Sequence, residues 1–173
     1  DAYMSQPVAR RAVRMFLAPA DSIIALTRWW MDRFIEGGVN RNLSAVPNPL
    51  SPELEIEAKS EYVEKQETAT VTVLIMTRLI MGKGADITLK ALAKTPSNVQ
   101  LIIAGDGDQL PALRQLADQL DLTDRVRFTG WVSGEKKAEL LKAADIFCLP
   151  TTNDVFPICV VEAMAYGIPV IST

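Results

Sequence analysis

Two carboxylates with a fixed spacing are the residues best placed to do chemistry in this chain. Asp154 and Glu162 are separated by seven residues, in a stretch that reads as an almost wholly apolar helix. Pro157 suits the first turn of that helix, and Gly167 and Pro169 predict its end. Glu162 then has apolar neighbours, where a carboxylate is costly unless it accepts hydrogen bonds. Ligand hydroxyls or a backbone N–H would supply them, and the residues alone leave both readings open.

A pair of cations is the second group with chemical potential. Arg78 and Lys83 flank a glycine-containing turn, which directly follows a predicted strand. Positive side chains beside a helix N-terminus favour a phosphate or a diphosphate. Ordinary surface charges on a solvated turn are the alternative interpretation.

Glycine turns follow two other predicted strands. Gly105 and Gly107 allow a tight turn close to a ligand. They do not form a G-x-G-x-x-G pattern, so a nicotinamide dinucleotide site is disfavoured. Gly130, Trp131 and Val132 make the turn after the third strand.

The elements that must position these residues alternate regularly from residue 70 onward. Strands are predicted at 71–76, 99–104, 126–128, 146–149 and 169–172, and helices at 86–94, 108–120, 135–143 and 157–166. Strands that are apolar on both faces indicate a parallel sheet covered by helices on both sides, the doubly wound α/β class. Ligands of this class bind at the carboxyl ends of the strands, near the switch in strand order. The cations, the glycine turns and both acids are therefore expected on one rim.

Residues 1–45 do not predict a complete domain. Their predicted elements are helices at 4–18 and 28–36 and short strands at 22–27 and 43–46. Each of these short strands stands among helices, and a single strand there has no sheet to pair with. We therefore expect residues 1–45 to be a remnant of an N-terminal domain with the crossover to a second domain at 46–173. The acidic segment 51–67 predicts a solvated linker or a short exposed helix.

Composition excludes several classes of function. The net charge of −3 gives no reason to expect a nucleic-acid partner, and the absence of histidine removes the commonest general base and metal ligand. No metal-ligand spacing is present. Cys148 and Cys159 lie in apolar runs, which favours a reducing compartment over a disulfide. No apolar run approaches 18 residues. The start at Asp1 without Met is what we expect of an excised piece.

The order of the motifs resembles one enzyme family. R-L-x-x-x-K-G, G-D-G, F-x-G-W-V, A-D-x-F-x-x-P-T and the acid–x7–acid helix that ends E-A-M-A-x-G-x-P-V-I occur in sequence. This order is similar to that of the family 4 glycosyltransferases of the GT-B fold, and it covers Val71 to Thr173. The resemblance implies a Rossmann-like C-terminal half of such an enzyme, truncated after its fifth strand. It also implies a retaining transfer of a sugar from a sugar nucleotide to an acceptor hydroxyl.

The resemblance assigns roles by position. Arg78 and Lys83 match the pair that holds and neutralises the donor diphosphate, and Glu162 matches the acid that accepts hydrogen bonds from the ribose hydroxyls. Asp154 stands where the family usually has Glu, in contact with the donor sugar. Pro157 and Thr77 replace usual glycines. The other implied donor-binding positions are Gly105, Gly107, Gly130, Trp131, Val132, Phe156, Pro157, Ile158 and Cys159.

The implied partners are a nucleotide-sugar donor and a saccharide or lipid-linked acceptor, with no metal, no other cofactor and no nucleic acid. Work in polysaccharide or glycolipid assembly in the cytoplasm is expected, at the inner face of a membrane if the N-terminal domain docks there. Trp29 and Trp30 with nearby arginines indicate either a membrane-surface face or an interdomain core. We expect the chain alone not to turn over. A non-catalytic or degenerate binding module, which Asp154 and Pro157 favour, and a GT-B sugar-nucleotide epimerase are the alternatives.

Overall fold

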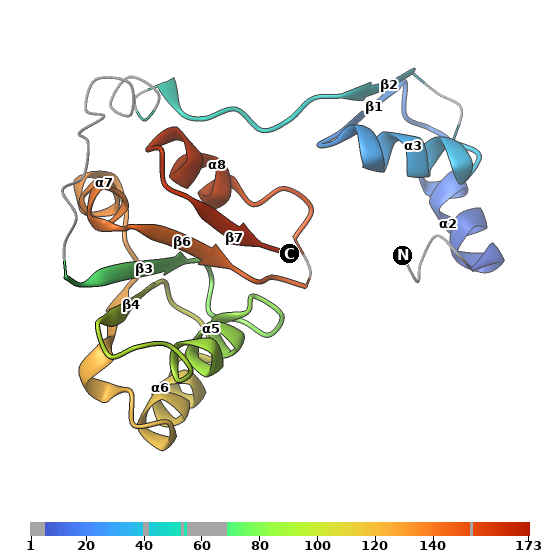
Figure 1. Cartoon of the computed structure of the whole chain (residues 1–173). Helices are drawn as coiled ribbons and strands as arrows, with labels where there is room; N and C mark the ends of the chain where they lie inside the picture. The colour runs from blue at the N-terminus through green and yellow to red at the C-terminus, as the bar shows by residue number, and fades with distance from the viewer. Residues whose placement is uncertain (1–5, 40–41, 53, 55–68, 153) are drawn as a thin grey trace. The chain divides into compact units, whose positions relative to one another are not determined.

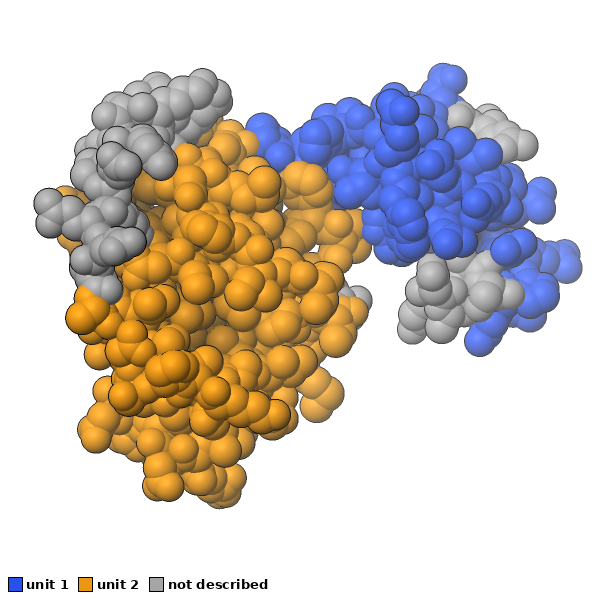
Figure 2. All heavy atoms as spheres, in the orientation of Figure 1, with its two compact units in different colours: residues 1–49 blue, residues 50–173 orange. Residues whose placement is uncertain are grey.

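The structure is a computed structural model that describes residues 6–39, 42–52, 54, 69–152 and 154–173. The chain divides into two compact units, Asp1–Pro49 and Leu50–Thr173, which are coloured blue and orange in Figure 2. Apart from residues 51, 52 and 54, the predicted acidic linker at 51–67 lies outside the described residues.

The first unit is a small β-α-β arrangement preceded by a helix. Its elements are α2 (Pro7–Leu17), β1 (Ser22–Ala25), α3 (Arg28–Glu36) and β2 (Asn42–Ala45). β1 and β2 pair in parallel, so the expectation of a strand without a sheet was wrong. The intervening α3 supplies the crossover that parallel strands need. Its N-terminus is capped by the Thr27 hydroxyl, which accepts a hydrogen bond from the Trp30 N–H at 3.2 Å. The assignment of this unit to an acceptor domain stays a prediction.

The second unit is built on a parallel sheet of five strands in the order β5-β4-β3-β6-β7. The strands are β3 (Val71–Met76), β4 (Val99–Ala104), β5 (Val126–Gly130), β6 (Ile146–Leu149) and β7 (Val170–Ser172). The helices are α5 (Ala85–Leu92), α6 (Leu110–Gln119), α7 (Gly134–Ala143) and α8 (Ile158–Ala165), with the 3₁₀ helix η1 (Thr123–Arg125) before β5. This confirms the predicted α/β class with a parallel sheet.

The strand order places a switch point between β3 and β6. From β3 the chain moves outward through β4 to β5, and it then returns to add β6 and β7 on the other side of β3. α5 and α6 contact each other, whereas α7 contacts β3 and α8 contacts β6 and β7. In Figure 1 the α5–α6 pair and the α7–α8 pair accordingly lie on opposite sides of the sheet. A ligand is expected beyond the carboxyl ends of β3 and β6.

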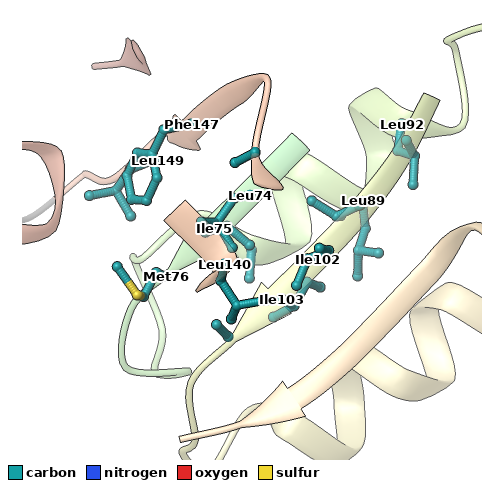
Figure 3. Packing of buried hydrophobic residues seen from close by; sticks show 14 of the residues in the cluster. Leu74, Ile75, Met76, Leu89, Leu92, Ile102, Ile103, Leu140, Phe147 and Leu149 are labelled. Atoms are coloured by element: carbon teal, nitrogen blue, oxygen red, sulfur yellow. The ribbon is translucent and has the colours of Figure 1, made fainter. Parts of the chain in front are cut away.

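The core lies along the three central strands, β4, β3 and β6. Figure 3 shows the side chains of Leu74, Ile75, Ile103, Phe147 and Leu149 gathered there, each with an exposed fraction of 0%. Strands buried on both faces require such continuous apolar runs, which is why their bounds were predictable. Truncating one of these side chains to alanine typically costs about 2–5 kcal/mol. This packing fixes the strand ends from which the candidate site is built.

The described helices are short. α2, with 11 residues, is the longest that the structure describes, and none of them has the length and apolar character needed to cross a membrane.

Candidate functional site

A cavity of about 460 Å³ opens at the carboxyl ends of the strands of the second unit. Every predicted site residue lines it except Gly107 and Gly130. The structure adds five residues to those predicted as site residues: Met76, Thr77, Ala104, Ser133 and Lys137. The walls come from the turns after β3, β4, β5 and β6 and from the first turns of α7 and α8. The convergence expected from the strand pattern is therefore present.

The glycines after β4 are explained by neighbouring backbone. A Cβ atom on Gly105, which has a φ of 147°, would lie 1.8 Å from the Thr77 carbonyl oxygen. A Cβ atom on Gly107 would lie 2.3 Å from the Leu79 carbonyl oxygen. These glycines were expected to allow a tight turn close to a ligand. The structure adds that they let the turn after β4 pack against the turn after β3.

Hydrogen bonds hold these turns together. The Thr77 N–H donates to the Ala104 carbonyl at 3.0 Å, and the Gly105 N–H donates to the Gly130 carbonyl at 2.8 Å. Gly130 thus stabilises the turn after β4, although it does not itself line the cavity. On the other side, the Gly82 carbonyl accepts from the Thr152 N–H at 2.9 Å. The turn that carries Arg78 and Lys83 is therefore fixed to the turns on both neighbouring strands.

The first ion pair of the cavity joins Lys83 to Asp154. The Lys83 Nζ lies 2.6 Å from the Asp154 Oδ1, and the two side chains are 11% and 20% exposed. Lys83 comes from the turn after β3, and Asp154 comes from the segment between β6 and α8. This ion pair thus links the two loops that meet at the switch point.

The second ion pair joins Lys137 to Glu162. The Lys137 Nζ donates to the Glu162 Oε1 at 2.7 Å, with side-chain exposures of 24% and 14%. The expected donor to Glu162 was a ligand hydroxyl or a backbone N–H, and this lysine was missed. A signal was available, because Lys137 shares one helical face with Leu140, Leu141 and Ala144, which are all buried.

The cavity has an excess of positive charge. Arg78, Lys83 and Lys137 contribute three positive charges, and Asp154 and Glu162 contribute two negative ones, so the lining carries a net charge of +1. Arg78 is exposed and forms no ion pair with another described residue. Within the described ranges, no three His, Cys, Asp or Glu side chains gather to hold a metal ion.

The N-terminus of α8 faces the same cavity. Pro157 is its N-cap with extended backbone, so the helix begins at Ile158 rather than at the predicted proline. The first N–H groups of a helix lack intrahelical acceptors, which leaves those of Ile158 and Cys159 available to an anion.

The two thiols of the chain are poor nucleophiles. Burial, with the nearby Glu162 and Asp154 carboxylates, raises the pKa of Cys159 to about 11. Burial also raises the pKa of Cys148, and a hydrogen bond with Thr88 offsets this only in part. Both side chains are therefore neutral near pH 7.

Comparison with known proteins relates this geometry to one family. Residues 56–173 match the family described as glycosyl transferases group 1. Alpha-monoglucosyldiacylglycerol synthase of Streptococcus pneumoniae is 29% identical over 171 residues, which cover 92% of this chain and 39% of that protein. An uncharacterized glycosyltransferase of Methanocaldococcus jannaschii is 37% identical over 101 residues, which cover 57% of this chain and 26% of that protein. The chain thus spans less than half the length of these relatives.

A solved structure extends the likeness to the fold. HepE of Anabaena, crystallised in complex with UDP and glucose, superposes with a TM-score of 0.74 at 25% identity. The match covers 95% of this chain and 48% of that one. The five-stranded unit corresponds to the Rossmann-like C-terminal domain of GT-B glycosyltransferases.

Proposed function

Because the chain belongs to the family of glycosyl transferases group 1, we propose that it carries the donor site of a glycosyltransferase. The donor is a nucleoside-diphosphate sugar, and the second substrate is an acceptor hydroxyl. The observation that carries the proposal is the cavity at the switch point, where three cations face two carboxylates. The HepE structures with UDP and with UDP-glucose support a uridine nucleotide as the first donor to test.

Arg78 and Lys83 are the proposed diphosphate ligands. Arg78 is exposed at the cavity and has no described ion-pair partner, so its guanidinium is available for bidentate binding of phosphate oxygens. Lys83 is buried, and its ammonium group points to Asp154. Positive charge at this place stabilises a departing diphosphate, because the charge on its oxygens grows in the transition state. The N–H groups of Ile158 and Cys159 add to this field.

Asp154 is the proposed contact to the donor sugar. Its carboxylate forms an ion pair with Lys83 in this structure. We propose that a bound diphosphate takes over Lys83 and that the released carboxylate then accepts a sugar hydroxyl. Aspartate is shorter by one methylene, about 1.5 Å, than the glutamate usual in the family 4 enzymes that the sequence resembles. The sugar must therefore approach the backbone at this position more closely.

Glu162 is the proposed ligand of the ribose hydroxyls. Its carboxylate lines the cavity eight positions after Asp154, on the second turn of α8. The nucleobase is then placed at the turn of Gly130, Trp131 and Val132. Trp131 is 69% exposed and lines the cavity, so its indole ring offers a face on which a base can stack.

The reaction we propose is a retaining transfer of the family 4 type that needs no metal. The positive charge of Arg78 and Lys83 takes the place of a metal ion at the diphosphate. The neutral thiol of Cys159 is unsuited to nucleophilic attack, so no covalent intermediate on this side chain is included. The remaining donor contacts are assigned to Gly105, Phe156 and Pro157, which line the same cavity.

The complete activity is assigned to a longer protein of the length of the relatives. We propose that the acceptor is a saccharide or lipid-linked and that residues beyond this chain bind it, so that the chain alone binds donor without transferring sugar. The name of the pneumococcal relative, alpha-monoglucosyldiacylglycerol synthase, supports a lipid acceptor. We further place the protein in the cytoplasm, with peripheral contact at the inner membrane face.

A non-catalytic binding module is the second candidate. The observation that favours it is the Lys83–Asp154 pair, since it occupies both a diphosphate ligand and the sugar contact. The two functions differ in one test. If the longer protein is a glycosyltransferase, it transfers sugar and Asp154→Ala abolishes that transfer. If the module is non-catalytic, the longer protein binds the nucleotide and transfers no sugar, with or without Asp154→Ala.

The experiment for donor binding is a thermal-shift panel on the 173-residue chain. UDP, GDP and ADP are compared with uridine and with pyrophosphate. A ligand at a hundred times its Kd stabilises the folded state by about 2.7 kcal/mol, which is a shift of several degrees in Tm. We expect a shift with UDP that neither uridine nor pyrophosphate reproduces. A folded chain that none of the nucleoside diphosphates stabilises contradicts the proposal.

A further inference from the structure

Lys137 is a cation of the cavity to which none of the donor-binding roles above is assigned. We propose that Lys137 is a positioning residue that fixes Glu162 for the ribose hydroxyls, so that the site selects ribonucleoside diphosphates over analogues without these hydroxyls. This inference rests on the proposed donor site and deepens it.

The position of Lys137 is set by the packing of α7. Leu140 and Leu141, three and four residues further on, are 6% and 0% exposed, so this face of the helix points into the protein. The lysine side chain is itself only 24% exposed, and it lies at the cavity rather than in open solvent. Its ammonium group is therefore held where a ligand would be bound.

The partner carboxylate is equally constrained. Glu162 is 14% exposed and precedes Ala163, which is fully buried against the core. Its Oε1 accepts from Lys137 at 2.7 Å, and no other described side chain within hydrogen-bond distance donates to it. A carboxylate accepts hydrogen bonds on both oxygens, so Oε2 remains for a ligand donor. A vicinal pair of hydroxyls is a donor group of suitable size.

The charge of Lys137 has a second consequence. An isolated carboxylate in this cavity would repel a polyanionic donor, and at partial burial this repulsion is only weakly screened. The ammonium group at 2.7 Å compensates the charge of Glu162 while it leaves one carboxylate oxygen to accept. Lys137 thus allows an acid to serve as a hydroxyl ligand in a site for diphosphates.

A purely structural role is the competing explanation. In that case the ion pair joins α7 to α8, and its loss lowers stability and the affinity for every ligand by one common factor. A positioning role instead makes the loss depend on the ribose hydroxyls. The choice between two ligands therefore separates the two roles, whereas stability alone does not.

The test compares UDP with 2′,3′-dideoxy-UDP in calorimetric titrations of the 173-residue chain. We expect wild type to prefer UDP by about tenfold or more, which corresponds to one strong hydrogen bond. In Lys137→Met the affinity for UDP falls by about tenfold, while that for the dideoxy analogue changes by about threefold or less. Lys136→Met is the matched control, because this neighbour is exposed, lies outside the cavity lining and carries the same charge.

Further variants keep the result interpretable. Lys137→Gln replaces Lys137→Met if the apolar variant does not fold, and Lys137→Arg restores the preference for UDP because it keeps a cation beside Glu162. We expect the double variant Lys137→Met with Glu162→Gln to prefer UDP over the dideoxy analogue no less than Glu162→Gln alone does. A preference for UDP that survives in folded Lys137→Met overturns this inference and leaves the donor site standing. A folded wild-type chain that binds no nucleoside diphosphate overturns both.

Discussion

The Lys83 ammonium and the Asp154 carboxylate lie 2.6 Å apart across the switch point of the sheet. Each comes from a different strand end, and the two loops are also joined by the hydrogen bond from the Thr152 N–H to the Gly82 carbonyl. In this arrangement one of the two proposed diphosphate ligands already has an anionic partner. A diphosphate must therefore compete with Asp154 for Lys83.

Asp154→Asn tests this competition. We expect the affinity of the chain for UDP to rise by roughly threefold to tenfold, because the amide no longer competes as an anion and the net charge of the cavity becomes more positive. The free energy of unfolding falls by about 1–3 kcal/mol in the absence of ligand, since the buried Lys83 loses its charged partner. Calorimetric titration measures the affinity, and urea denaturation measures the stability.

The matched control is Asp86→Asn. Asp86 pairs with Lys90 at 2.9 Å, but both side chains are about half exposed and neither lines the cavity. This variant removes the same charge, and we expect the affinity for UDP to stay within about twofold of wild type. An Asp154→Asn chain that binds UDP no better than wild type would show that the ion pair does not compete with the ligand.

The glycine turns allow a prediction on stability. Gly105→Ala places a Cβ atom 1.8 Å from a backbone oxygen, so the turns after β3 and β4 must separate. Gly130→Ala meets nothing within 4 Å, although its φ of 73° is left-handed. We expect Gly130→Ala to cost about 1–2 kcal/mol and Gly105→Ala to cost more than about 3 kcal/mol. Equal losses in urea denaturation would argue against the close approach of the two turns.

The raised pKa of Cys159 predicts a pH-dependent reactivity. In a Cys148→Ala chain, alkylation of Cys159 by iodoacetamide should be slow at pH 8 and rise roughly tenfold per pH unit until the pH reaches about 11. Saturating UDP should slow the reaction, because Cys159 lines the cavity. A rate that levels off near pH 9, as for an ordinary thiol, or that UDP does not change would be inconsistent with this placement.

The same shift affects stability with a definite sign. The thiol of the unfolded chain ionises near pH 9.0, whereas that of the folded chain stays protonated up to about pH 11. Between these values the unfolded state binds fewer protons, so the free energy of unfolding falls as the pH rises. Cys159→Ala should remove this part of the alkaline loss, which denaturation curves at pH 8 and pH 10.5 can measure.

Much of the fold could be predicted because the central strands are buried on both faces. The bounds of β3, β4 and β6 match the predicted strands at 71–76, 99–104 and 146–149, since largely apolar runs mark them. β5 extends two residues further, to Gly130, because its end pairs with Ala104 beyond an irregularity in register. The pairing of β1 with β2 was missed because nothing in two short strands specifies a partner.

The candidate site was predictable in its loops and less so in its contacts. The rule on strand ends brought Arg78, Lys83 and Asp154 to one rim without any knowledge of distances. The contact between Lys137 and Glu162 joins residues on two separate helices. Helical spacing places Lys137 on the buried face of α7, but it does not identify Glu162 as the partner. The role of Gly105 was likewise hidden, because it depends on a carbonyl group from another strand end.

The central claim is that the cavity binds the diphosphate of a nucleotide. Its most direct test is a calorimetric titration of UDP into the 173-residue chain, with Arg78→Ala as the variant and Arg127→Ala as the control, because Arg127 is exposed and lies outside the cavity lining. We expect binding with a Kd in the range of about 1 μM to 1 mM, lost in Arg78→Ala and kept in Arg127→Ala. A folded wild-type chain without measurable binding, or an Arg78→Ala chain that binds UDP like wild type, would contradict the claim.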